Sequence, residues 1–255
     1  MSKIIICILS LVFGLELFFC VNGRADTYTK EEIEQAAAKA VPSAVFAEVK
    51  KGSGLCSEAS ETSVIKTLTR KESAEILKDF SLKWYYIKTD GGSYWTKAEN
   101  LIIPPDPKTA ADELSSREIE CYVNSKGFKS KTQYFLWADL YRQQLYLLEG
   151  QKGSFSLKKR IVCSSGKNVS PTTRGLFETS DKGEWFYSER LKSGAKYWIR
   201  FNGSYLLHSV AMDKEGNVTD PTLGVRSSSG CIRTSLRDSE YLYKTIPKGT
   251  SVWVN

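Results

Sequence analysis

Short runs of alternating apolar and polar residues, separated by turn residues, dominate this 255-residue sequence and constrain its fold more than any other feature. Five such runs follow one another between Ala44 and Ile103, and Asp90-Gly91 is typical of a tight hairpin. From about residue 120 onward the pattern is again mostly that of strands, with one hairpin turning near residues 141–143. The sequence therefore predicts a mainly β protein with few short helices.

Two helices are predicted. Residues 26–43 contain the first, since Thr29 can cap it, Glu32 completes a capping box and Pro42 stops it. The second lies in the segment RDSEYLYKTIPKG, where Asp238 stands near the N-terminal end.

The chain is long enough for two domains. Five short strands within residues 44–103 fit a small β-barrel. Residues 104–118 carry three prolines within four positions, which stiffen the chain and remove hydrogen-bond donors, so this segment is interpreted as a linker. Residues 119–255 are predicted to form the second domain.

Residues 1–25 have the layout of a secretory signal peptide: Lys3, then an apolar run, then small residues ending at Ala25. Glu16 interrupts the apolar run and disfavours a retained membrane anchor, because a carboxylate is costly inside a bilayer. The protein is therefore expected to be secreted and to lie in the cell wall or another extracytoplasmic place, without a stable membrane anchor.

The charge balance is mildly basic, at +7 for the whole chain, with 34 basic and 28 acidic residues once the predicted signal peptide is removed. Such a surface attracts anionic wall polymers, although a merely soluble basic surface explains the charge equally well. The charge is dispersed and the protein is predicted to be exported, so nucleic acid is not expected as a partner.

Four cysteines remain after the predicted signal peptide, too few for a disulfide scaffold. The sequence does not decide whether Cys56 and Cys121 form a disulfide. Neither a metal site nor any other cofactor is expected, since the sequence has no CxxC pair and only one histidine.

That one histidine, His208, follows a β run, and Cys231 lies 23 residues later in the segment SSSGCIRTS. A free thiol needs a base to become a thiolate near neutral pH, and histidine is the usual one. Ser209 can position the imidazole through its main chain or its hydroxyl. The alternative is an ordinary buried histidine that only satisfies its hydrogen bonds.

An anion site can form next to the cysteine. Main-chain N–H groups of the turn at Ser229 and Gly230, together with that of Cys231, can converge on one oxygen. Arg233 adds a positive charge that can orient a carboxylate or favour the thiolate. Cys163 is the rival nucleophile, but it lacks the Gly-Cys turn and the arginine, so a structural role is favoured.

The segment HSVAMDKEGNVTDPTLGVRSSSGCIRTS resembles the signature of the L,D-transpeptidases of the YkuD type. CSSGKNVSPTTRGLF and DSEYLYKTIPKGTSVWV resemble the family's preceding and closing elements in the same order, so the resemblance spans about residues 118–255. Two departures stand out: Ser229 replaces a second histidine that many members carry, and Thr173 replaces a common proline. The resemblance implies a β-sandwich-like catalytic domain.

The segment KWYYIKTDGGSYWTKAENL resembles the end of a bacterial SH3-like domain, which implies a module that binds wall peptides or spaces the catalytic domain. A packing domain with no ligand is the alternative. The combination of the two domains is similar to Gram-positive, clostridial members of the family.

The resemblance implies acyl transfer between peptidoglycan stem peptides, with Cys231 as the nucleophile, His208 as the base and 3→3 crosslinks as the product. It also implies acylation of Cys231 by carbapenems. Tyr197 and Trp198 are expected to wall the donor groove, with core packing as the alternative for at least one of them. Two alternatives remain: an L,D-carboxypeptidase using the same site with water as acceptor, and a non-catalytic cell-wall-binding protein.

Overall fold

The computed structural model describes residues 28–151 and 154–255. The predicted signal peptide lies outside the described residues. Within the described ranges, no helix is both long and apolar enough to cross a membrane. The three α-helices of these ranges are α1 (Lys30–Lys39), α2 (Ser116–Ser125) and α3 (Leu236–Thr245), and the rest of the regular structure is almost entirely strand, which confirms the mainly β fold class.

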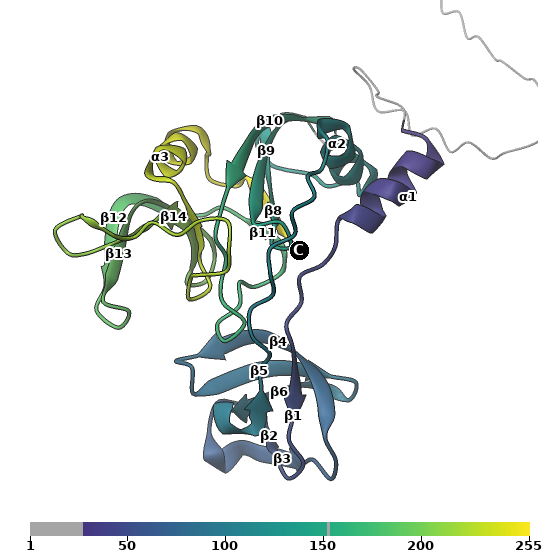
Figure 1. Cartoon of the computed structure of the whole chain (residues 1–255), viewed down its shortest axis with the longest axis vertical. Coiled ribbons are helices and arrows are strands. Elements are labelled where there is room, and N and C mark those ends of the chain that lie inside the picture. Colours follow the sequence, from purple (N-terminus) through teal and green to yellow (C-terminus); the bar gives the residue numbers. More distant parts are fainter. Residues whose placement is uncertain (1–27, 152–153) are drawn as a thin grey trace, which may run out of the picture.

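Sheet A is the N-terminal domain (Figure 1). Its seven strands lie in the order β3-β2-β6-β5-β4-β1-β7 around their own apolar core. Their bounds are β1 Phe46–Val49, β2 Gly54–Cys56, β3 Val64–Thr67, β4 Glu72–Phe80, β5 Trp84–Thr89, β6 Gly92–Lys97 and β7 Leu101–Ile102. The sequence predicted five strands: it missed β2, which has only three residues, and the 3₁₀ turn Ala98–Asn100 separates β7 from β6.

Two sheets form the C-terminal domain. Sheet B has the order β10-β9-β8-β18-β11, and its strands are β8 Tyr134–Asp139, β9 Gln144–Gln151, β10 Ser154–Val162, β11 Gly175–Glu178 and β18 Ser251–Val254. Sheet C has the order β16-β15-β13-β14-β17, with β12 also paired to β13. Its strands are β12 Lys182–Ser188, β13 Ser193–Asn202, β14 Tyr205–Ser209, β15 Ala211–Met212, β16 Val218–Asp220 and β17 Ile232–Thr234.

Alternation along the strands of sheet B divides their side chains between two cores. Leu136 and Leu145 face sheet C and α3, in a core that also contains Leu207, Ile232 and Leu242. The neighbouring residues of the same strands face α1 and α2 instead. The C-terminal domain is therefore layered as helices, sheet B, then sheet C with α3, which agrees with the expected sandwich-like arrangement.

Helix α2 begins at Ser116, inside the range predicted as a linker. Its capping box is formed by Ser115 and Glu118, and its apolar side is buried against sheet B. The proline-rich part before it is not free either, because Asn168 Nδ2 donates to the carbonyls of Pro104 (3.1 Å) and Pro105 (2.9 Å). Prolines lack an N–H but keep their carbonyls as acceptors, and here these carbonyls attach the segment to the C-terminal domain.

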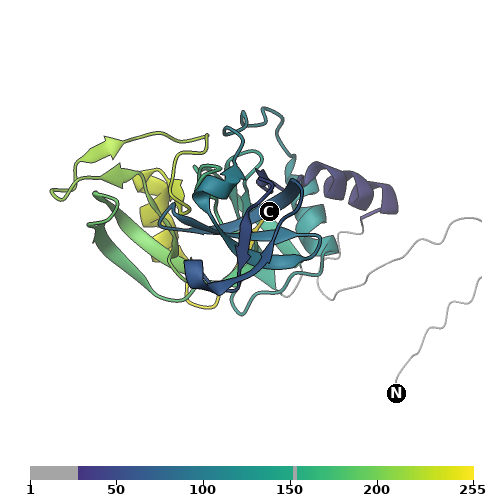
Figure 2. The same cartoon turned by 90° about the horizontal axis from the view of Figure 1, so that it is seen from below.

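Helix α1 has the predicted capping box of Thr29 and Glu32, and it packs on α2 rather than on sheet A. Arg117 Nε donates to Glu32 at 2.6 Å across this contact. The chain therefore starts on the C-terminal domain, crosses to sheet A and returns through residues 104–115, so that two segments join the domains (Figure 1). Seen from below, sheet A lies in front of the C-terminal domain, with α1 on the opposite side from the β12–β13 hairpin (Figure 2).

Candidate active site

The sheet register brings His208 and Cys231 together. Strand β14 pairs in parallel with β17, with Leu207 opposite Ile232 and His208 opposite Arg233. Leu207 and Ile232 point into the core between sheets B and C. Side chains alternate along a strand, so His208, Arg233 and Cys231 all project from the other face of sheet C. Strand spacing and rise put the Cα atoms of His208 and Cys231 about 8 Å apart.

His208 is buried and held in one orientation. Its Nδ1 lies 2.6 Å from the main-chain carbonyl oxygen of Ser209, and the edge of its ring packs against Phe186 with centroids 5.3 Å apart. A carbonyl oxygen only accepts hydrogen bonds, so the neutral ring carries its proton on Nδ1 and leaves the lone pair on Nε2. Burial lowers the pKa of His208 to about 4, and Arg233 adds to this effect while the Ser209 carbonyl opposes it. The imidazole is therefore an uncharged base at neutral pH.

Ser209 was expected to position the imidazole through its main chain or its hydroxyl, and in the structure its main-chain carbonyl is the group that contacts His208. Its hydroxyl is engaged elsewhere, accepting from the Lys196 N–H (2.9 Å) and donating to the Val210 carbonyl (3.0 Å).

The thiol of Cys231 is partly exposed, and its Sγ lies 3.9 Å from the Ser204 carbonyl. Burial raises the pKa of Cys231, while a hydrogen bond with the Leu206 main chain and the charges of Arg233 and Arg200 lower it. The net direction is upward, so the resting pair is a thiol beside a neutral imidazole. Deprotonation of the thiol then requires the base, as expected for a nucleophile of this kind.

A hydroxyl that the sequence analysis did not single out fixes the cysteine turn. Ser228 is buried, and its Oγ donates to the Cys231 carbonyl (2.5 Å) and accepts from the Gly230 N–H (3.1 Å). The Gly230 amide is thus occupied, which corrects the expectation that it points at a substrate oxygen. The N–H groups of Ser229 and Cys231 are the remaining predicted donors.

The turn requires glycine at position 230. Its φ is +107°, and a Cβ there would lie 2.8 Å from Cε1 of Tyr205. On the other side, Thr172 Oγ1 donates to the Gly230 carbonyl (2.7 Å) and accepts from the Gly166 N–H (2.9 Å). A Cβ on Gly166 would lie 2.9 Å from the Cα of Gly230, so these backbones meet at a distance that only glycine permits. The segment before β11 is thus the support of the cysteine turn.

Arg233 lies near both Cys231 and His208. Its Nη1 donates to Asp220 at 2.7 Å, while its Nε is buried without a hydrogen-bond partner among the described residues. Its charge lowers the pKa of both Cys231 and His208, so it favours the thiolate and the neutral base together. The sequence analysis missed Asp220 and Arg200 because nothing near the cysteine motif points to them.

The structure places Tyr197 away from this face, which corrects its predicted role in the groove. Its φ is +56°, and its ring packs against Tyr243 of α3 with centroids 5.7 Å apart. Trp198 alternates with the core residue Ile199 and therefore lies on the face of His208. Its indole Nε1 donates to the Trp185 carbonyl at 3.2 Å. Of the two aromatics, only Trp198 is positioned to contact a substrate at the cysteine.

The other cysteines do not take part in this site. Cys163 is fully buried between sheets B and C, and burial together with the charge of Asp139 raises its pKa far above the usual range. All four cysteines in the described ranges are free, so the structure contains no Cys56–Cys121 disulfide. The described residues hold no cluster of histidine, cysteine and carboxylate side chains able to bind a metal ion.

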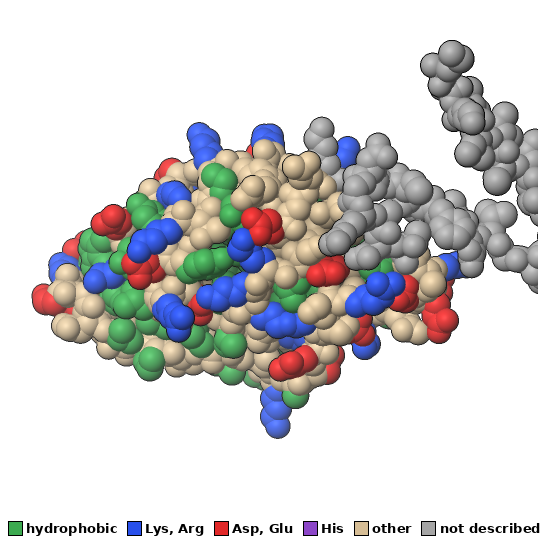
Figure 3. All heavy atoms as spheres, turned by 90° about the horizontal axis from the view of Figure 1, so that it is seen from above, with side chains coloured by type: hydrophobic (Ala, Val, Ile, Leu, Met, Phe, Trp, Pro, Cys, Tyr) green, Lys and Arg blue, Asp and Glu red, His purple; other side chains and the backbone are tan. Residues whose placement is uncertain are grey.

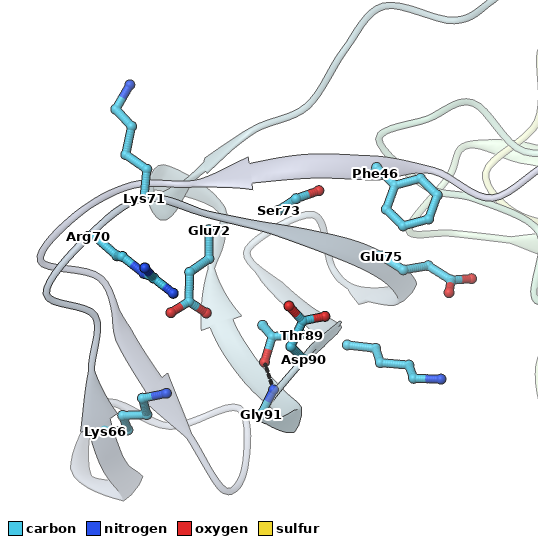
Figure 4. A pocket seen from close by; sticks show the side chains of 11 residues that line it. Phe46, Lys66, Arg70, Lys71, Glu72, Ser73, Glu75, Thr89, Asp90 and Gly91 are labelled. Atoms are coloured by element: carbon cyan, nitrogen blue, oxygen red, sulfur yellow. Dashed lines mark hydrogen bonds between the residues drawn. The ribbon is translucent and has the colours of Figure 1, made fainter.

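A separate depression of about 840 Å³ lies on sheet A (Figure 4). Basic and acidic side chains share its lining: Phe46, Lys66, Arg70, Lys71, Glu72, Ser73, Glu75, Lys88, Thr89, Asp90 and Gly91. Charges of both signs also intersperse over the face of the molecule seen in Figure 3. Neither this depression nor that face is therefore a purely basic surface.

Comparison with known proteins identifies the C-terminal domain. The model of the L,D-transpeptidase catalytic domain (YkuD) matches residues 133–254. A Bacillus subtilis protein, YciB, whose name assigns it provisionally to the L,D-transpeptidases, is 33% identical over 134 residues, covering 48% of this chain and 67% of that protein. The chain belongs to the L,D-transpeptidase (YkuD) family.

Two solved structures align with part of the chain. A fused Zn-dependent amidase/peptidase/peptidoglycan-binding domain-containing protein from Clostridium acetobutylicum is 33% identical with a TM-score of 0.47, and the match covers 54% of this chain and 58% of that one. An L,D-transpeptidase from Stackebrandtia nassauensis is 22% identical with a TM-score of 0.40, covering 56% and 67% respectively.

Proposed function

We propose that this protein is a peptidoglycan L,D-transpeptidase that forms 3→3 crosslinks through a thioester on Cys231. The observation that carries the proposal is the register of β14 and β17, which puts Cys231 and His208 on one face of sheet C with the lone pair of His208 Nε2 free. Membership of the family supports the reaction class.

In the first step Cys231 attacks the carbonyl between the third residue of a donor tetrapeptide stem and its terminal D-Ala. The S–C bond forms as the thiol proton moves to His208 Nε2, and the C–N bond then breaks as that proton passes to the leaving amine of D-Ala. The N–H groups of Ser229 and Cys231 are the proposed donors to the oxygen that becomes negative. The nearby charges of Arg233 and Arg200 favour the negative charge of the Cys231 thiolate before the attack.

In the second step the side-chain amine of the third residue of another stem attacks the thioester. His208 Nε2 takes the proton of this amine and returns it to the sulfur as the C–S bond breaks. No ATP is consumed, because the energy of the donor peptide bond is conserved in the thioester.

We place the protein outside the cytoplasm, at the cell wall, where its substrate lies, and anionic wall polymers are proposed as secondary partners. The N-terminal domain is proposed to be SH3-like, as its sequence resemblance implies.

Product analysis tests the reaction. The purified protein is incubated with disaccharide-tetrapeptide, and the products are separated and weighed by mass spectrometry. Dimers that contain a 3→3 bond, together with free D-Ala, are expected from the wild type and not from Cys231→Ala. Trimmed tripeptides without dimers would identify a carboxypeptidase instead, and unchanged substrate would favour a wall-binding protein.

A further inference from the structure

The N-terminal domain contacts one particular loop of the C-terminal domain, residues 167–174, which we call the support loop. Asp79, at the end of β4, accepts a hydrogen bond from Ser170 Oγ through Oδ1 at 2.6 Å. The hydroxyl of Tyr85 on β5 donates to the Val169 carbonyl at 2.8 Å. An ion pair joins Glu75 to Arg174 at 2.5 Å. The support loop thus makes three contacts, at Val169, Ser170 and Arg174, with the neighbouring strands β4 and β5 of sheet A.

These contacts are shielded from solvent to a degree that gives them weight. Tyr85 is 3% exposed and Ser170 is 5% exposed, and the side chains of Glu75 and Arg174 are also largely covered. A hydrogen bond at such a site stabilises one geometry more than an exposed bond does, because the unpaired groups would lose their solvation.

The support loop holds the cysteine turn with its other side. Thr172 Oγ1 donates to the Gly230 carbonyl at 2.7 Å, one residue before Cys231. The loop contains no helix and no strand. Since regular hydrogen bonding does not fix its backbone, its shape depends on what it contacts. Sheet A and the cysteine turn hold Val169 to Arg174, while Asn168 is bound by residues 104–106 and by Arg226.

Tyr205 of β14 lies against the same cysteine turn. Its ring lies against Gly230, at 2.8 Å from the position that a Cβ would occupy. Burial raises the pKa of Tyr205 to about 12. The charges of Asp79, in the N-terminal domain, and of Cys231, in the C-terminal domain, add to this increase, so the phenol lies within electrostatic reach of both.

We propose that the N-terminal domain positions the active-site cysteine: Asp79 and Tyr85 are positioning residues that act on the turn at Gly230 and Cys231 through the support loop. The role of Cys231 in this inference rests on the proposed function. The inference adds to that function an essential contribution of the first domain to the geometry of the site, beyond binding or spacing.

The test removes two of the hydrogen bonds between sheet A and the support loop, those of Tyr85 and Ser170, and leaves the Arg174–Glu75 ion pair and the candidate site residues in place. The variant Tyr85→Phe/Ser170→Ala deletes both and leaves the bond from the Leu82 N–H to Asp79 in place. The matched control is Tyr94→Phe/Ser63→Ala, which removes hydroxyls that bond only within sheet A, to Gly91 and to Glu58 and Ser60. The single variant Ser170→Ala leaves the core of sheet A unchanged and serves if the double variant folds poorly.

Two readouts are taken on the full chain. The first is the rate of Cys231 alkylation by iodoacetamide against pH, resolved by mass spectrometry from the other cysteines of the chain. A displaced turn weakens the contacts that favour the thiolate, so we expect the midpoint to rise by roughly 0.5 to 1 pH unit. The second is turnover of the disaccharide-tetrapeptide, in which kcat should fall roughly tenfold with little change in KM, as for a loss of orientation.

The control variant should keep both wild-type values. An unchanged alkylation midpoint and kcat in a folded Tyr85→Phe/Ser170→Ala protein would overturn the proposal, as would equal effects in the control. Alkylation needs no peptidoglycan, so a wild type that makes no crosslinks would contradict the proposed function while the midpoint shift still tests the positioning role.

Discussion

The protonation of His208 provides the sharpest quantitative prediction, because it is the only histidine in the chain. Its pKa in the folded protein is about 4, against an ordinary value of 6.5. A depressed pKa means that the unfolded chain binds the proton first. The contribution of the neutral ring to stability is therefore complete above about pH 6.5 and is lost as the pH falls toward 4.

The size of the loss follows from the two pKa values. Linkage gives about 3 kcal/mol between pH 7 and pH 4, with about half of it lost by pH 5.5. The assay is denaturant unfolding at pH 7, 5.5 and 4 of the wild type and of His208→Gln, whose side chain does not titrate. The difference in unfolding free energy between the two proteins should fall by that amount, since carboxylates titrate alike in both.

The same measurement has a direct check, since the ring's NMR resonances should titrate near pH 4 in the folded protein. A parallel pH dependence of the wild type and His208→Gln, or a titration midpoint near 6.5, would refute the reasoning that burial and Arg233 keep this imidazole neutral.

Three further predictions follow from the site. Incubation with a carbapenem should add one drug mass to Cys231, and a wild type left unmodified would favour the wall-binding alternative; Cys231→Ala should gain no mass. Arg233→Gln should move the alkylation midpoint of Cys231 to higher pH, because the charge of the arginine lowers the pKa of Cys231. An unchanged midpoint would show that the paired carboxylate of Asp220 already cancels the charge of Arg233. Gly230→Ala should reduce kcat at least roughly tenfold and destabilise the protein by about 1–3 kcal/mol. Gly203→Ala is its control, since its φ is also positive but no atom lies within 4 Å of the new Cβ, and equal losses in both would contradict the close approach to the Tyr205 ring.

Local sequence predicted most of the elements because their signals are local. The alternation of apolar and polar residues predicted β4, β5, β8 and β9, and most of the apolar side chains of these strands are buried in the cores. The errors have local causes too. Helix α2 was not predicted, and its first three residues were placed in the linker because three prolines precede them, although Ser115 and Glu118 form a capping box before its apolar residues.

The sequence predicted some residues of the candidate site, and only the tertiary structure showed the roles of the others. The motif around Cys231, the single histidine and the family resemblance sufficed to select Cys231 and His208 as the candidate pair, which the structure places on one face of sheet C. The sequence offered no means to choose between Tyr197 and Trp198, because a positive φ at Tyr197 interrupts the alternation that such a choice relies on. Nor did it indicate that the Ser228 hydroxyl occupies the Gly230 amide.

The sequence by itself determined which chemical groups are available: one base, one candidate thiol and a glycine turn. It also determined which residues of each strand are apolar and which are polar. The tertiary structure alone decided which of these groups meet. His208 and Cys231 are 23 residues apart in the chain, and Asp79 and Ser170 are 91 apart. Contacts over such separations depend on strand register and domain packing, which are set by the burial of many side chains at once and not by any local pattern.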